Sequence, residues 1–218
     1  MPVTKLPEQK FIAAFDIDAQ NTFTPLCPQE LPIAGGDEIV PELNLQATYA
    51  ALRIASRDAH SSQALWLTDS AHPIYAPIDG YPNLDLHWPA HAIVGTKGFD
   101  FIPGLDPAGY AYQAYKGIEP DKHPYGACYH NLDDSLSTGV LEFLRDNGIT
   151  TVICGGLALD YCVKTTVLQL VQAGFDVILN LAATRGIAPD TVATALKEMQ
   201  AAGVTILNQA AELQTLKS

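Results

Sequence analysis

Cys162 lies at a point in the sequence where a thiol could act as a nucleophile. It follows the apolar run 151–154, which is typical of a buried strand, and begins a helical pattern of apolar residues over 163–173. Unpaired N–H groups and the dipole at a helix start favour thiolate, which can lower a cysteine pKa from about 8.5 to near neutrality. The sequence therefore predicts a nucleophile, although a lone cysteine is more often a small buried hydrophobic residue.

Asp18 and Lys116 also directly follow apolar runs, and they supply the charges that a cysteine nucleophile needs. Alone, Asp18 would more often cap a turn and Lys116 would more often be solvated. Near a thiol, a carboxylate can accept its proton and an ammonium can stabilise the thiolate. At about 4 Å and an effective dielectric near 20, each charge contributes roughly 4 kcal/mol with opposite sign. We therefore expect one proton to move between Asp18 and Cys162 at little cost.

A second group of residues has the chemistry of a divalent metal site. Asp58 and His60 form an Asp-x-His pair, and His91 follows further along the chain. Two imidazoles and one carboxylate suit zinc best, with iron or manganese as alternatives, and leave coordination positions open. An Asp-x-His pair alone is more often structural. The sequence leaves a fourth ligand undecided among Ser62, Asp69 and His72, and assigns the remaining histidines to the surface or to packing: His87, His123 and His130.

The elements that must position these residues alternate along the chain. Strands are predicted over 11–17, 50–55, 109–115, 151–154, 176–180 and 204–207, and helices over 134–147, 163–173 and 189–202. This alternation predicts an α/β fold: a three-layer, doubly wound sheet of about six mainly parallel strands, with helices on both faces. Ligands of such sheets bind beyond the carboxyl ends of the strands, where the reactive side chains are found.

We interpret residues 1–218 as a single domain, since no linker-like stretch divides them. Residues 61–90 are long, irregular and rich in proline and aromatic residues, which is typical of a lid or a substrate-binding loop. We expect this segment to fold over the site, with Trp88 as one wall.

Charge and composition restrict the partners. A formal charge of −12 and a pI near 4.7 argue against nucleic acid and anionic membranes. The sequence shows no apolar span or leader, and its four cysteines lack a disulfide framework. We therefore expect a cytoplasmic protein with reduced thiols that acts on a small molecule, and the sequence leaves a homo-oligomer open.

Five segments together resemble the ordered motifs of the isochorismatase-like cysteine hydrolases, and within them the nicotinamidases, also called pyrazinamidases. The segments are 18–23, 56–60, 88–91, 115–117 and 156–163. The resemblance spans about residues 11–207. It implies a catalytic triad of Asp18, Lys116 and Cys162, and a metal site of Asp58, His60 and His91.

The same resemblance implies further roles. Phe23, Trp88 and Tyr125 would line the substrate pocket. A cis bond between Leu157 and Ala158 would direct the amides of Ala158 and Cys162 at an oxyanion. The sequence departs from the usual family pattern at four positions, none of which removes a reacting group: Thr22, where an acidic residue is usual, Ala59, Ala92 and Leu159.

The implied activity is hydrolysis of nicotinamide to nicotinic acid and ammonia through a cysteine thioester, a step of NAD salvage. The alternatives are another small-amide hydrolase of the superfamily, acting on N-carbamoyl compounds or maleamate, and a non-catalytic binding protein with the same fold. The former would share the triad and generally lack the metal motifs. A thiol redox protein is disfavoured because no resolving cysteine lies near Cys162.

Overall fold

A six-stranded sheet organises the part of the chain that this computed structural model describes, residues 2–217. All pairings between its strands are parallel, and the strand order is β3-β2-β1-β4-β5-β6. The strands are β1 (Ile12–Ile17), β2 (Leu52–Asp58), β3 (Tyr112–Lys116), β4 (Thr151–Leu157), β5 (Asp176–Arg185) and β6 (Thr205–Leu207). The strand order reverses between β1 and β4, so the switch point that binds ligands in such sheets lies beyond their carboxyl ends.

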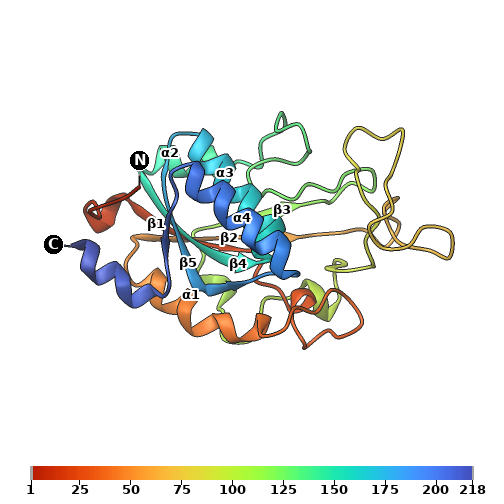
Figure 1. Cartoon of the computed structure of the whole chain (residues 1–218), viewed down its shortest axis with the longest axis horizontal. Helices are drawn as coiled ribbons and strands as arrows, with labels where there is room; N and C mark the ends of the chain where they lie inside the picture. The colour runs from red at the N-terminus through yellow and green to blue at the C-terminus, as the bar shows by residue number, and fades with distance from the viewer. Residues whose placement is uncertain (1, 218) are drawn as a thin grey trace.

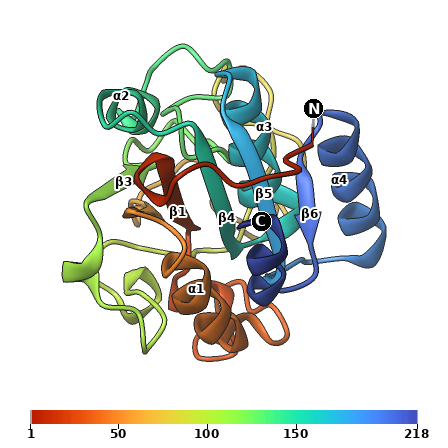
Figure 2. The same ribbon diagram turned by 90° about the vertical axis from the view of Figure 1, so that its left-hand side faces the viewer.

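Helices cover both faces of the sheet (Figures 1 and 2). Helices α2 (Val140–Asp146), α3 (Lys164–Gln172) and α4 (Pro189–Ala201) pack on one face, against a core that includes Phe15 and Val152. Helix α1 (Val40–Ala47) and the C-terminal 3₁₀ segment Ala210–Lys217 lie on the other face. Because both faces are covered, β1 and β4 are buried along their whole length, which explains their continuous apolar runs. The predicted three-layer fold is confirmed.

The predicted elements differ from the structure mainly at their ends. All six strands are present, but β2 extends to Asp58, past the predicted end at residue 55. The helix predicted over 134–147 begins only at Val140, because the Asn131 side chain closes a turn on Ser135 and Gly139 has a φ of 87°. Helix α1 was not predicted, since few apolar residues form its buried side.

Residues 61–90 form an irregular segment that extends away from the sheet, at the right of Figure 1. Isolated bridges join Leu67 to Trp88 and Pro77 to Leu86. The segment has a small core of its own, made of Ala64, Trp66, Leu84 and Trp88. It is therefore anchored by apolar packing, without regular secondary structure. Within residues 2–217, no helix has both the length and the apolar character needed to cross a membrane.

Candidate active site

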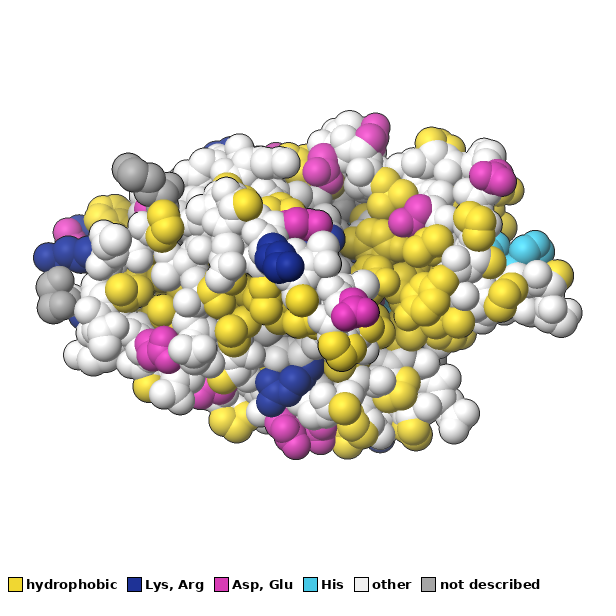
Figure 3. Space-filling model, viewed as in Figure 1, with side chains coloured by type: hydrophobic (Ala, Val, Ile, Leu, Met, Phe, Trp, Pro, Cys, Tyr) yellow, Lys and Arg dark blue, Asp and Glu magenta, His cyan; other side chains and the backbone are white. Residues whose placement is uncertain are grey.

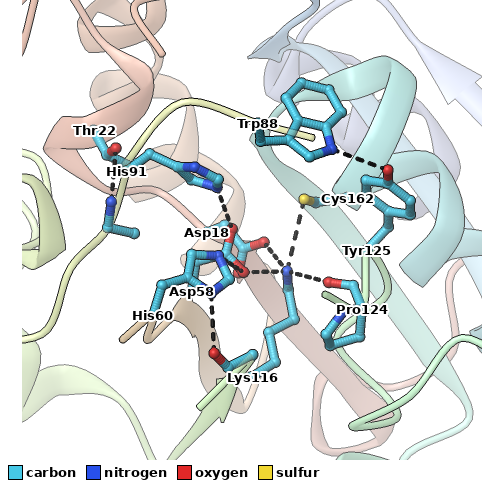
Figure 4. A network of polar contacts seen from close by, with 12 residues as sticks. Asp18, Thr22, Asp58, His60, Trp88, His91, Lys116, Pro124, Tyr125 and Cys162 are labelled. Carbon is cyan, nitrogen blue, oxygen red and sulfur yellow. Dashed lines mark hydrogen bonds and ion pairs between the residues drawn. The ribbon is translucent and has the colours of Figure 1, made fainter. Parts of the chain in front are cut away.

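Four chemically reactive side chains meet beyond the carboxyl ends of the central strands. Asp18 follows β1, Asp58 ends β2, Lys116 ends β3, and Cys162 lies in the turn after β4. The Lys116 Nζ lies 3.1 Å from Asp18 Oδ2, 2.5 Å from Asp58 Oδ1 and 3.7 Å from Cys162 Sγ (Figure 4). The structure thus brings together the three side chains predicted as a triad, with the buried ammonium at their centre.

The backbone turns sharply at Asp18 and directs its carboxylate into this cluster. Its φ of 46° is in the left-handed region, which ends the extended conformation of β1. The Ser56 hydroxyl donates to Asp18 Oδ1 at 2.6 Å, and the Asp18 amide donates to the Ser56 carbonyl at 3.1 Å. The carboxylate is fully buried and held from β2, so it keeps a fixed orientation toward the thiol.

The turn that carries Cys162 has an unusual backbone. The Leu157–Ala158 peptide bond is cis, as the resemblance implied, and residues Leu159–Val163 form one π-helical turn before α3. The Asp160 carboxylate accepts hydrogen bonds from the amides of Ile187 and Ala188. These contacts tie the turn to the chain after β5 and place the Cys162 sulfur near the triad partners.

Burial controls the charges in this cluster. Burial acts to lower the pKa of Lys116, but the carboxylates of Asp18 and Asp58 raise it well above its usual range. Burial raises the pKa of Asp18 above its usual value, against the opposing effect of Lys116. For Asp58, Lys116 and His60 outweigh burial and hold the pKa well below its usual range. Lys116 is therefore a cation that Asp58 neutralises, and Asp18 is the more basic carboxylate.

The pKa of the Cys162 thiol is shifted in the direction opposite to the prediction. We expected the helix start to lower its pKa, but burial raises the pKa of Cys162 well above its usual value, against the opposing effect of Lys116. The side chain is only 6% exposed, so water contributes little to stabilising a thiolate. The resting residue is therefore a thiol, and its ionisation needs a nearby base. Asp18 satisfies this need, because a carboxylate oxygen of Asp18 lies within 4.8 Å of the sulfur.

Asp58, His60 and His91 are arranged as the ligands of a divalent cation would be. The Nε2 atoms of His60 and His91 lie 3.5 and 3.9 Å from the Asp58 oxygens. The Nδ1 of His60 pairs with the Gly117 carbonyl at 3.0 Å, and that of His91 with the Pro89 carbonyl at 2.7 Å. These carbonyls fix the tautomer in which Nε2 has a free lone pair.

The charge state of these rings also fits a metal. The His60 Nε2 is buried and has no hydrogen-bond partner, which is costly unless another group binds it. Burial and the neighbouring His60 lower the pKa of His91 to about 3, so this ring is neutral, as a ligand must be. The donor set of two imidazoles and a carboxylate thus fits a zinc-type ion.

A pocket beside Cys162 brings together the three residues predicted to bind substrate. Phe23, Trp88 and Tyr125 all line it, next to Cys162 and His91. The Trp88 Nε1 donates to the Tyr125 hydroxyl at 3.2 Å, and that hydroxyl donates to Asp85 at 2.9 Å. Figure 3 shows hydrophobic side chains gathered around a hollow beside the 61–90 segment. The pocket therefore suits a flat, largely apolar ring.

Comparison with known proteins shows the family to which this chain belongs. The isochorismatase domain family matches residues 13–211. The chain belongs to the isochorismatase family. The nicotinamidase of Escherichia coli is 33% identical over 199 residues, covering 87% of this chain and 91% of that protein. The nicotinamidase of Acinetobacter baylyi is 30% identical, covering 86% of this chain and 88% of that protein.

Solved structures are also similar to this isochorismatase-family chain, and two of them illustrate the likeness. The nicotinamidase/pyrazinamidase of Acinetobacter baumannii superposes with a TM-score of 0.86 at 28% identity, covering 96% of this chain and all of that one. The zinc complex of the Pyrococcus horikoshii pyrazinamidase gives a TM-score of 0.72 at 29% identity, covering 92% and 99%. The predictions of the family and of its fold are confirmed.

The residues that the sequence offered as a fourth ligand do not reach the candidate metal cluster of Asp58, His60 and His91. Ser62, Asp69 and His72 are exposed, and His72 Nδ1 pairs with Asp69 at 3.0 Å. His123, which the sequence assigned to packing or the surface, instead has a ring nitrogen within 4.8 Å of those of His60 and His91. No local motif marked His123, because long-range folding of the segment after Lys116 places it there.

The departure from the family pattern at Thr22 has a structural explanation. The Thr22 hydroxyl donates to Glu30 at 2.5 Å, and both side chains accept a hydrogen bond from the Ala92 amide at 3.0 Å. Glu30 thus brings a carboxylate to the place that Thr22 leaves without one. The pair holds the backbone directly after His91, where Ala92 has a φ of 47°.

Proposed function

We propose that this protein is a nicotinamidase, an amidohydrolase that converts nicotinamide to nicotinic acid and ammonia through a thioester on Cys162. One observation carries the proposal: a buried thiol, base and ammonium converge beside an aromatic pocket that also contains a candidate metal cluster. The curated relatives described above are named nicotinamidase, which supports the same substrate.

The reaction begins with attack of the Cys162 thiolate on the carboxamide. The pyridine ring lies between Phe23 and Trp88, with its carboxamide carbon beside the Cys162 sulfur. Asp18 accepts the thiol proton, since its own pKa is raised and it lies within 4.8 Å of the sulfur. Lys116, 3.7 Å from that sulfur, stabilises the thiolate as it attacks the carboxamide carbon.

Collapse of the resulting tetrahedral intermediate forms the thioester, and its hydrolysis follows, so that both products are released. The amides of Ala158 and Cys162 donate to the oxyanion, and one such donor contributes about 3 to 4 kcal/mol in a well-studied acyl-transfer enzyme. Asp18 returns its proton to the departing amine, so ammonia leaves and the thioester remains. Asp18 then removes a proton from an attacking water, which releases nicotinic acid and restores the thiol.

Asp58, His60 and His91 hold the divalent metal in this proposal, with zinc preferred over iron or manganese. When bound there, such an ion would supply a Lewis-acidic position for the ring nitrogen of the substrate. Residues 61–90 serve as the substrate-binding loop, since they contribute Trp88 to the pocket and pack around Trp66. Hydrolysis of N-carbamoyl or maleamate-type amides has less support, since those substrates carry no pyridine nitrogen for the metal.

The test is to incubate the purified protein with nicotinamide and follow ammonia, with and without a chelator. Cys162→Ala should lower ammonia release by at least about 10⁴-fold, because the nucleophile is lost. Cys154→Ala is the matched control: Cys154 is a fully buried cysteine on the preceding strand, outside the pocket.

Three outcomes are informative. Turnover of nicotinamide by the Cys162→Ala variant near the wild-type rate would remove the thioester route. No turnover of nicotinamide by the metal-loaded wild type, together with turnover of an N-carbamoyl amide, would favour the alternative substrate class. Full activity after complete metal removal would show that catalysis by the triad does not require the metal.

A further inference from the structure

His123 lies with the two histidines of the candidate metal cluster although it comes from a different part of the chain. One nitrogen from each ring of His60, His91 and His123 lies within 4.8 Å of the others, and all three side chains are buried. The ring centroids of His123 and His60 are 5.2 Å apart, and those of His123 and His91 are 5.7 Å apart. Three imidazoles within this range can share one ion.

The His123 ring is held in a fixed position, yet its buried Nδ1 makes no hydrogen bond. Its Nδ1 is buried without a partner, and the side chain is only 4% exposed. The backbone is held on both sides: the His123 amide donates to the Asn83 carbonyl at 3.0 Å, and the Pro124 carbonyl accepts from Lys116 Nζ at 3.1 Å. A buried polar nitrogen in a rigid setting is costly unless a further group binds it.

The nearest alternative is that His123 is only a wall of the pocket. The ring lines the pocket and packs against Trp66, with centroids 4.5 Å apart. An aromatic or aliphatic side chain would serve that purpose without burying an unpartnered nitrogen. Packing alone therefore explains the position of the ring but not why an imidazole with an unpartnered nitrogen is buried there.

We propose that His123 is a third imidazole ligand of the metal bound by Asp58, His60 and His91. This inference rests on the metal site of the proposed function, and it does not depend on the substrate. Asp58 already contacts Lys116 through Oδ1, so its negative charge is shared between the ammonium and the ion. A third imidazole adds a donor that favours zinc or iron, whereas carboxylates and water suit manganese. His123 should therefore strengthen zinc binding more than manganese binding.

The first experiment measures metal affinity without substrate. The wild type and its variants are stripped of metal, and Zn²⁺ and Mn²⁺ are titrated in competition with a chromophoric chelator. His123→Gln should weaken Zn²⁺ binding by at least about tenfold, because loss of even an outer-shell partner of a ligand typically costs 10 to 100-fold. Mn²⁺ binding should change less. His130→Gln is the matched control, since His130 follows on the same connection and also has an unpartnered, buried Nδ1, but lies outside the cluster.

His91→Gln separates failure of this inference from failure of the metal site. If His91→Gln loses Zn²⁺ affinity and His123→Gln does not, the ion is bound without His123 and the proposal is wrong. If neither variant changes affinity, the proposed metal site itself is wrong.

A second measurement covers the case in which His123→Gln does not fold. Long-range ¹H–¹⁵N spectra of the histidine rings in the wild type, with and without Zn²⁺, report which ring nitrogens bind metal. Three rings should move to metal-bound shifts. Movement of only two rings would overturn the proposal.

Discussion

Asp16 and Asp18 lie two residues apart at the end of β1, and the structure gives them different surroundings. Both are fully buried, and each pairs with a cation. The Asp16 Oδ2 accepts hydrogen bonds from Arg53 Nε at 2.9 Å and from the Tyr110 hydroxyl at 2.8 Å. Asp18 instead faces Lys116 and the thiol of Cys162. The same residue type, once inside β1 and once directly after it, thus serves two different clusters.

The difference shows that a buried ion pair can take part in chemistry only where its charged atoms also contact a reactive group. The Arg53 side chain is 19% exposed, so its pair with Asp16 extends to solvent, and two hydrogen bonds and the ion-pair contact of Arg53 Nη2 converge on one Asp16 oxygen. The Lys116 side chain is fully buried, and its ammonium contacts two carboxylates and a sulfur. Asp16 links β1 through hydrogen bonds to Arg53 on β2 and to Tyr110 before β3. Asp18 instead lies beside the thiol of Cys162, which can donate a proton to it.

The sharpest test of this comparison replaces each aspartate by asparagine. Asp18→Asn should lower kcat by about 10³-fold or more, because an amide cannot accept the thiol proton and general-base catalysis is worth about 10² to 10⁴. Asp16→Asn should keep kcat within a few-fold, because Asp16 touches no reacting group. Steady-state ammonia release measures both variants. Comparable losses of kcat in the two variants, with native circular dichroism spectra, would show that the two pairs are not functionally distinct.

The next effect is on stability. Arg53→Met removes the cation from Asp16 and should lower the free energy of unfolding by about 3 kcal/mol, because the buried carboxylate loses its partner. The double variant Arg53→Met with Asp16→Asn should recover much of that loss, since no charge then stays buried. Denaturant unfolding measures all three variants. Equal destabilisation of the single and double variants would mean that Arg53 acts through packing on Tyr110 and not through its charge.

The sequence was sufficient to predict the cluster around Asp18 but not the cluster around Asp16. Asp18, Lys116 and Cys162 each follow an apolar run, and parallel strands bring such positions to one edge of the sheet. Asp16 lies inside the run, where the pattern shows only a polar residue among apolar ones. Its partner Arg53 is on a neighbouring strand, and the pairing depends on the register of Asp16 with Ala55.

Two other features depended on tertiary structure in the same way. The raised pKa of Cys162 follows from burial of the turn beneath other segments, whereas local sequence indicates only the helix start. His123 lies beside His60 and His91 because its amide donates a hydrogen bond to the Asn83 carbonyl in the 61–90 segment. Periodicity therefore predicted the strands and the residues at their ends, but it could not predict contacts made between irregular segments.

The smallest expected effect is a pH dependence of stability that belongs to Asp16. Burial raises its pKa from 3.8 to about 6, so the native state binds this proton more tightly than the unfolded state. The resulting stabilisation is fully present below about pH 4 and is lost as the pH rises through about 6. Between about pH 5 and pH 7 the wild type should lose about 1 kcal/mol from this group.

Asp16→Asn removes this contribution, so the difference in unfolding free energy between wild type and variant should change by that amount over the same interval. Taking the difference cancels the other titrating groups, including His91 and His123, whose lowered pKa values act in the opposite direction. Urea unfolding at several pH values provides the measurement. A difference that stays constant with pH would mean that Arg53 keeps Asp16 ionised throughout, and Asp16 and Asp18 would then differ in proton affinity as well as in partners.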